Sequence, residues 1–226
     1  MVKSLIGLGS NVSAANYKGD SSLHLAAREG WEHGVTTLVN LGANINDRNN
    51  EGDSPLHQAA CKGDENMVKA LLRLEANYTA VNNEGDTPLH QAARHGKITT
   101  VENLARLGAN ISAKNNMGDS PLHQAACKGD ENMVKALLRL GANSAAVNNE
   151  GSSPLHQAVI FEKENIVETL VGLGADMAAR NKKVYLYLDS CLRLCPNINC
   201  DILTDFECIA GHTYSDLTRG LQLHQA

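Results

Sequence analysis

Histidine and cysteine are the residues of this sequence best suited to bind a metal or move a proton, and the chain holds 9 and 6 of them. Five histidines recur every 33 residues within the phrase Leu-His: His24, His57, His90, His123 and His156. Such residues occupy equivalent places in successive units, and packed helices lie about 8–10 Å apart. Nitrogens that share a zinc ion lie about 2.0–2.1 Å from it. The spacing therefore predicts no metal site among these histidines.

The cysteines fall into two groups. Four lie near the carboxyl end, with 3, 4 and 7 residues between them, which matches no common zinc-finger spacing: Cys191, Cys195, Cys200 and Cys208. A metal site and disulfide bonds are the minor alternatives for this group. Cys61 and Cys127 occupy equivalent places in a repeated phrase, and we expect them to be free thiols in a reducing compartment.

No motif of a known catalytic site is present. The chain has no Gly-x-Ser-x-Gly and no His-Glu-x-x-His. Gly7-Leu-Gly9 and Gly172-Leu-Gly174 lack the further Gly or Lys of a nucleotide-binding loop. Three glycosylation sequons begin at Asn11, Asn77 and Asn110, and we interpret them as chance matches because the start of the chain does not resemble a secretory signal. We therefore expect no enzyme activity, no cofactor and no metal.

Composition excludes two further classes. The 226 residues carry 20 Lys+Arg against 25 Asp+Glu, a net charge of −5, with no basic cluster. This argues against binding nucleic acid through its phosphates. No apolar run approaches the ~18 residues of a membrane span. We expect a monomeric, intracellular protein of the cytoplasm or nucleus that does not insert into membranes.

A fixed period organises the chain. One phrase, Gly-Asp/Ser-Ser/Thr-Pro/Ser-Leu-His, recurs in register, beginning at Gly19, Gly52, Gly85, Gly118 and Gly151. A constant period of this size indicates a solenoid, in which each unit contacts only its neighbours. Two segments, 52–74 and 118–140, are identical residue for residue, so a unique catalytic constellation is not expected in them.

One unit can be read from its residue types. Ser54 can cap a helix and Pro55 suits its first position, which predicts a helix over 55–62 that ends at Gly63. Asp64 is a second cap, before a helix that carries one apolar stripe. The stripe is formed by Met67, Val68, Leu71 and Leu72. Residues 77–85 are rich in Asn and Gly, which predicts an exposed hairpin.

The second helix is expected to carry charge on its other face and to end in a left-handed residue. Glu65 and Lys69 are spaced to form a favourable pair on that face. Gly141 suits the left-handed helix stop of the fourth unit. Glu75 stands at the same place in the second unit, where a side chain costs about 1 kcal/mol.

These residues resemble the ankyrin repeat. The third unit is the best copy, with Thr87-Pro-Leu-His90, Ala92-Ala93, Gly96 and Gly108-Ala-Asn110. The resemblance covers roughly residues 1–183 and implies an all-α solenoid of helix-turn-helix units joined by β-hairpins or loops. It also implies that each motif histidine hydrogen-bonds the backbone that joins adjacent repeats.

The resemblance divides the chain into a partial repeat (1–18), five repeats (19–183) and a degenerate sixth repeat with the start of another (184–226). An unrelated tail and a frame error in the gene are alternatives for the last part, where Asp189 replaces the motif His and Val184 the hairpin Gly. Cys191, Cys200 and Cys208 then fall on small apolar positions, while Cys195 falls on a glycine position. Both ends interrupt a repeat, which suggests a segment of a longer array or a gene model that lost its ends.

In this family, first helices and hairpins line a concave face that binds other proteins. The positions that vary between repeats are then the candidate partner-binding residues. On the first helices they are Arg28, Glu29, Cys61, Lys62, Arg94, His95, Cys127, Lys128, Ile160 and Phe161. On the hairpins they are Arg48, Glu51, Asp53, Glu84, Asp86, Met117, Asp119 and Glu150. We expect a basic strip along the first helices, edged by an acidic rim at the hairpin tips.

Two functions follow from this interpretation. The first is a non-catalytic scaffold that binds a protein partner. The alternative is the substrate-recruiting part of a larger machine, either a ubiquitin-ligase adaptor or a microbial effector. Cys191-Leu-Arg-Leu-Cys195-Pro196 is faintly similar to the suppressor-of-cytokine-signalling box of such adaptors.

Overall fold

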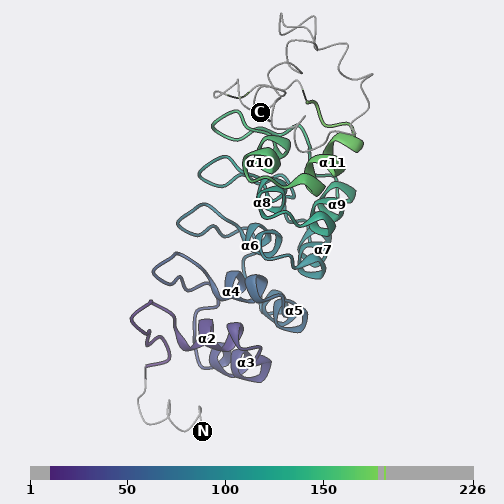
Figure 1. Cartoon of the computed structure of the whole chain (residues 1–226). Coiled ribbons are helices and arrows are strands. Elements are labelled where there is room, and N and C mark those ends of the chain that lie inside the picture. The colour runs from purple at the N-terminus through teal and green to yellow at the C-terminus, as the bar shows by residue number, and fades with distance from the viewer. Residues whose placement is uncertain (1–10, 178–180, 182–226) are drawn as a thin grey trace, which may run out of the picture.

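The computed structural model describes residues 11–177 and 181. This part of the chain folds into successive pairs of short helices (Figure 1). The pairs are α2 (Ser22–Arg28) with α3 (Glu32–Asn40), α4 (Pro55–Lys62) with α5 (Glu65–Arg73), α6 (Pro88–Arg94) with α7 (Ile98–Arg106), α8 (Pro121–Lys128) with α9 (Glu131–Arg139), and α10 (Pro154–Ile160) with α11 (Glu164–Gly172). The all-α solenoid is confirmed.

The helix boundaries follow from local chemistry. In α4, the side chain of Ser54 and that of His57 cap each other's backbone amides, and Pro55 opens the helix. Gly63 ends it with a left-handed φ of 81°. Asp64 then caps α5 by accepting the Met67 amide at 3.0 Å. The helices predicted for this unit are therefore confirmed.

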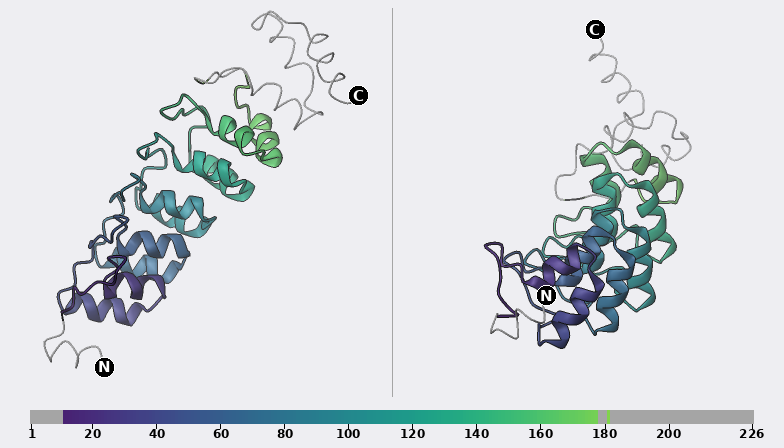
Figure 2. Two further views of the ribbon diagram at one scale, coloured as in Figure 1. Left: turned by 60° about the vertical axis from the view of Figure 1, so that its left-hand side comes forward. Right: turned by 90° about the horizontal axis from the view of Figure 1, so that it is seen from below.

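The helix pairs stack into an elongated, two-layered array. The first helices α2, α4, α6, α8 and α10 form one layer, and the second helices form the other (Figures 1 and 2). The connecting loops project beside the first-helix layer (Figure 2). Among the described residues these loops contain turns and one isolated β-bridge, between Ala15 and Ser21, so they are turn loops rather than extended β-hairpins.

The core runs between the layers and is built of small units. Leu56, Met67, Val68 and Leu71 are fully buried, and equivalent residues are buried in the other repeats. Leu72, which we predicted on the same stripe, is half-buried and faces a neighbouring second helix. No aromatic side chain belongs to the buried core of the described residues. This agrees with the low aromatic content of the chain.

Hydrogen bonds join the turn loop of one repeat, which we also call its hairpin, to the turn loop of the next. The side chain of Asn83 donates to the Asn50 carbonyl at 2.9 Å, and Asn116 donates in the same way to Asn83. The turn glycine permits this approach, because a Cβ on Gly85 would lie 2.6 Å from the Asn116 backbone nitrogen. Gly85 also has a left-handed φ of 79°. The recurring glycine therefore meets two constraints at once, one of backbone conformation and one of space.

The histidine links are also observed. Nε2 of the motif histidine lies 2.9–3.1 Å from a carbonyl of the next repeat in four successive repeats. The histidines are His24, His57, His90 and His123. This confirms their predicted role. The predictions for residues 184–226, including the four clustered cysteines, concern residues outside the described part.

Candidate functional site

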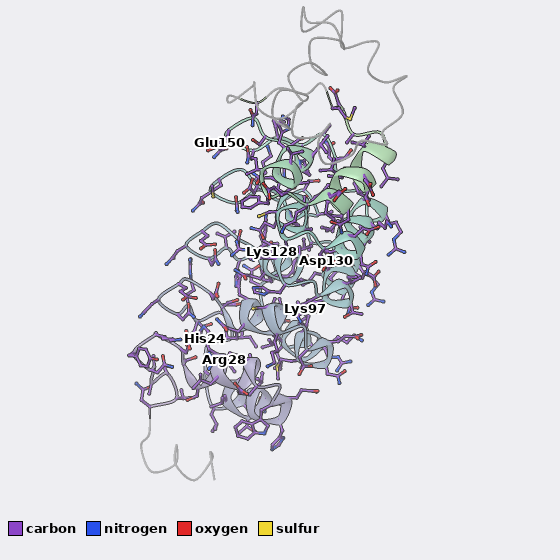
Figure 3. The ribbon with its side chains drawn as sticks, in the orientation of Figure 1. His24, Arg28, Lys97, Lys128, Asp130 and Glu150 are labelled. Carbon is purple, nitrogen blue, oxygen red and sulfur yellow. The ribbon has the colours of Figure 1, made fainter. Side chains whose placement is uncertain are left out.

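The strongest candidate site is a hollow of about 540 Å³ on the hairpin face. We use this term for the surface formed by the first helices and the loops that precede them, where Lys128 and Glu150 lie (Figure 3). The hollow is lined by Glu84, Arg94, Asn115, Asn116, Met117, Asp119, His123, Gln124, Cys127, Lys128, Gln157 and Phe161. It spans α6, α8 and α10, so three successive repeats contribute to it.

Seven of the residues predicted from sequence variation meet in this hollow. They are Glu84, Arg94, Met117, Asp119, Cys127, Lys128 and Phe161. Four further lining residues belong to the repeated motif, so variation between repeats did not identify them as binding residues: Asn115, His123, Gln124 and Gln157. A glutamine recurs at the position of Gln124 in the first helices of the second to fifth repeats, whereas the first repeat has Leu25 there, and this recurrence was a signal that could have drawn attention to Gln124 and Gln157.

The hollow exposes apolar side chains and one cation without an ion-pair partner among the described residues. Met117 is 62% exposed and Phe161 is 47% exposed, although both are large and apolar. Lys128 is exposed and has no ion-pair partner among the described residues. Exposed apolar groups beside an unpaired ammonium can contact a partner that offers both apolar surface and a carboxylate.

The predicted basic strip is wrong at two of its four positions. Arg94 forms ion pairs with Asp86 and with Glu84, the latter at 3.2 Å. Arg28 contacts Asp20 at 3.4 Å. Both guanidinium groups therefore offset charges within the chain. Among the residues that the structure describes, the cations of the strip without an ion-pair partner are Lys62 and Lys128.

The predicted acidic rim also needs correction. Asp53 and Asp86 are 8% and 0% exposed, so they lie inside the molecule and not at the hairpin tips. Their carboxylates accept hydrogen bonds from Asn82 at 2.8 Å and Asn115 at 2.9 Å, one repeat further along. A buried carboxylate needs such partners. Asp119 is half-buried and accepts in the same way from Asn148.

The remaining predicted residues lie on the surface or near it. The rim consists of the exposed Glu51, Glu84 and Glu150. Arg48 is exposed and bridges two loops, since its Nε donates to the Gly52 carbonyl at 3.1 Å in its own loop and its Nη2 donates to Asn83 Oδ1 at 3.4 Å in the next. Glu29, Lys62, His95, Ile160 and Phe161 are exposed, whereas Cys61 and Cys127 are half-buried free thiols.

Partial burial makes the two described thiols poor nucleophiles. Burial raises the pKa of Cys127, although Lys128 acts in the opposite direction. The pKa of Cys61 is raised by burial and by the charge of Asp53. Because the thiolate is the reactive form, both residues are protonated and unreactive near neutral pH.

The serine–histidine pairs at the helix starts have a geometry that could suggest catalysis. Ser54 Oγ lies 2.8 Å from His57 Nδ1, the distance of a nucleophile and its general base. His57 is fully buried, however, and its Nε2 faces the Asp86 carbonyl at 3.0 Å. Burial lowers the pKa of His57. The same arrangement recurs with Ser120 and His123, so it is a repeated helix cap.

Within residues 11–177 and 181, no group of three His, Cys, Asp or Glu side chains could hold a metal ion. No helix in this part of the chain is both long enough and apolar enough to cross a membrane.

Stacked pairs of short helices that recur along the chain, with a recessed face of varied side chains, define a repeat solenoid. A family model described as ankyrin repeats, in three copies, matches residues 1–82, 23–115 and 89–181. The chain belongs to the ankyrin-repeat family. Repeats of this family are generally protein–protein interaction modules and are typically non-catalytic. No curated protein matches the chain.

Proposed function

We propose that this protein is a non-catalytic scaffold that binds a protein partner on its hairpin face, centred on the hollow between α6, α8 and α10. The observation that carries the proposal is the convergence of residues from three repeats on one recess. The residues that vary between repeats supply its exposed apolar groups and its free cation. The inter-hairpin hydrogen bonds hold the surrounding loops in place, which lowers the entropy lost on binding.

The chemistry of the hollow constrains the partner. Lys128 favours a carboxylate, and Met117 and Phe161 favour apolar side chains beside it. The exposed carboxylate of Glu150 on the rim favours basic side chains further out. A partner with an acidic and apolar centre flanked by basic residues fits this surface, and the charges act mainly on association rate and selectivity.

The test begins with capture of partners by the whole chain. For the partner recovered, the binding of wild-type protein is compared with that of Lys128→Glu and Phe161→Ala. Loss of a central aromatic contact or reversal of a central charge weakens binding by about tenfold or more. Recovery of elongin and cullin subunits would instead favour a ubiquitin-ligase adaptor.

The duplicated segment provides the matched control. Lys62 occupies the same place as Lys128 in an identical stretch of sequence, but it does not line the hollow. Lys62→Glu should therefore leave the affinity nearly unchanged. Equal effects of the two lysine variants, or no effect of either, would contradict the proposed centre. Arg94 is left out of the test, because its replacement would strand the buried Asp86 carboxylate.

A further inference from the structure

The second-helix layer carries a repeated Arg-Leu pair that the hairpin-face scaffold does not use, with an exposed arginine in each copy and a leucine that is half-buried at Leu74 and exposed at Leu107 and Leu140. Three successive second helices end in Arg-Leu: Arg73-Leu74, Arg106-Leu107 and Arg139-Leu140. All three arginines are exposed, and Leu107 is 51% exposed. The repeat places these pairs at the same end of neighbouring helices. We call the surface formed by α5, α7 and α9 the Arg–Leu face.

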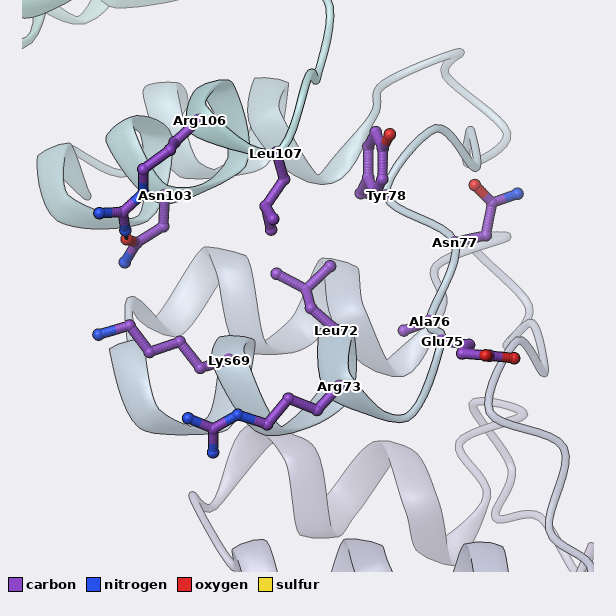
Figure 4. A pocket seen from close by; sticks show the side chains of 10 residues that line it. All are labelled: Lys69, Leu72, Arg73, Glu75, Ala76, Asn77, Tyr78, Asn103, Arg106 and Leu107. Atoms are coloured by element: carbon purple, nitrogen blue, oxygen red, sulfur yellow. Dashed lines mark hydrogen bonds between the residues drawn. The ribbon is translucent and has the colours of Figure 1, made fainter.

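A hollow of about 720 Å³ opens on this face between α5 and α7. Leu72 and Leu107 face each other across it, with Lys69 and Arg106 at one end and Tyr78 at the other, while Arg73 extends along the edge of α5 that lies away from α7 (Figure 4). Its volume lies within the range of roughly 300–1,000 Å³ that is usual for ligand sites. It is partly open to solvent, so a segment of another chain can reach the apolar side chains that line it.

Tyr78 shapes one end of this hollow. It packs with Leu72 against the small cluster formed by Leu89, Leu104 and Ala109 of the next repeat. The equivalent residue is aliphatic in the adjacent repeats, at Ile45 and Ile111. At the junction of α5 and α7, an aromatic ring therefore occupies the position that an isoleucine side chain occupies in the adjacent repeats.

The duplicated segment again supplies a comparison. Helix α9 has the same sequence as α5, but Ser144 stands where Tyr78 does in the earlier repeat. On the opposing helix α11, Gly172 replaces Arg106, whereas Leu173 retains the leucine of Leu107. The junction of α9 and α11 therefore lacks both the aromatic end and the second arginine.

The charges around the hollow are unbalanced. Its lining includes three cations, Lys69, Arg73 and Arg106, but one carboxylate, Glu75, which points away from the opening (Figure 4). Lys69 is paired with Glu65. Arg73 has no ion-pair partner within residues 11–177 and 181. In a chain with a net charge of −5, this is a local site that favours anions.

We propose that the hollow between α5 and α7 docks an acidic amphipathic segment of a second protein partner. Apolar side chains of the segment would lie between Leu72 and Leu107, and its carboxylates would pair with Arg73 and Arg106. This combination follows the helix-in-groove mode of recognition. A membrane surface fits less well, because the apolar groups line a recess instead of projecting as a continuous patch.

The test uses a fluorescein-labelled helical peptide with two leucines one turn apart, flanked by glutamates, and fluorescence anisotropy with the full chain. We expect saturable binding that disappears when the glutamates are replaced by lysines. Arg73→Glu combined with Arg106→Glu should weaken binding by about tenfold or more. Leu107→Gln should also weaken it, while circular dichroism confirms that each variant folds.

Two controls separate this site from the others. Arg139→Glu alters the equivalent arginine of α9 and should leave peptide affinity nearly unchanged. Lys128→Glu alters the hairpin face and should also have little effect, so failure of the scaffold proposal and failure of this one are distinguishable. The proposal is overturned by absence of peptide binding, by equal loss in either control, or by phosphatidylserine vesicles binding in place of the peptide.

Discussion

At the scale of single residues, Glu75 holds a side chain in a backbone conformation that favours glycine. Its φ is 65°, and Gly141 occupies the equivalent place after the duplicated segment with a φ of 89°. The left-handed region crowds a Cβ against the backbone. Glu75→Gly should therefore raise the free energy of unfolding by about 1 kcal/mol, measured by urea denaturation.

The duplicate makes the reciprocal substitution informative. A Cβ at Gly141 would meet no atom within 4 Å, so Gly141→Glu imposes the backbone cost without a steric clash. We expect it to lower the free energy of unfolding by a similar amount. A shift in the same direction for both variants would show that the backbone conformation is not the cause.

The buried aspartates give a second prediction at this scale. Asp86 is fully buried and accepts hydrogen bonds from Asn115 and Gln124, both at 2.9 Å, besides its ion pair with Arg94. Asp86→Ala should lower the free energy of unfolding by about 3 kcal/mol, because it strands the donors around it. Asp53 has no such arginine, so thermal unfolding of Asp53→Ala should reveal a smaller loss. The reverse order would contradict this account.

At the scale of the helices, the motif histidines join one first helix to the next repeat. His57 Nδ1 accepts the Ser54 amide at 3.1 Å, and its Nε2 donates to the Asp86 carbonyl. Both ring nitrogens therefore have hydrogen-bond partners. A second proton, on Nδ1, would point at the N–H group of Ser54, which is itself a donor. Burial lowers the pKa of His57, His90 and His123 below the ordinary value of 6.5.

This arrangement predicts acid lability. Above about pH 6.5 the three rings are neutral in both the folded and the unfolded chain. Below it the unfolded chain takes up protons that the folded chain does not, so the free energy of unfolding falls as the pH falls. Urea denaturation at about pH 7.5 and about pH 5.5 should show the loss. His90→Gln should make this pH dependence of the free energy of unfolding shallower. A free energy of unfolding that does not change over this pH range would contradict the predicted effect of the buried histidines.

At the scale of the whole molecule, stability should be uneven along the array. Helices α4–α9 have a described repeat on each side, and interfaces between neighbours supply most of the stability of a solenoid. Their amides should exchange most slowly in native-state hydrogen exchange followed by mass spectrometry. Slowest exchange in α2–α3 or in α10–α11 would contradict this account.

Local chemistry made much of the fold predictable. Helix caps such as Ser54 and Asp64 act on amides two or three residues away, and the turn glycines act on their own backbone. These signals repeat in register, so the two helices of each repeat, their order and the solenoid followed from the sequence. Even the strained conformation of Glu75 was predictable, because the in-register comparison with Gly141 exposes it.

The candidate site was only half predictable from sequence. Variation between repeats identified Lys128, Met117 and Phe161, but not that they would share one recess with Gln124 and Gln157. The same variation did not show that Arg94 is held by Asp86. A comparison of equivalent positions in the repeats does not distinguish a residue that binds a partner from one that stabilises the fold when both are polar and lie on the same face.

The sequence by itself determined the family, the repeat and the helices, because those depend on interactions within one unit. The tertiary structure decided which charges are free. Asp53 and Asp86 accept hydrogen bonds from asparagines 29 residues further along the chain, a partnership that exists only once one repeat has packed on the next. The hollow between α5 and α7 has the same origin, because Tyr78 and Arg106 belong to different repeats and their proximity depends on how those repeats stack.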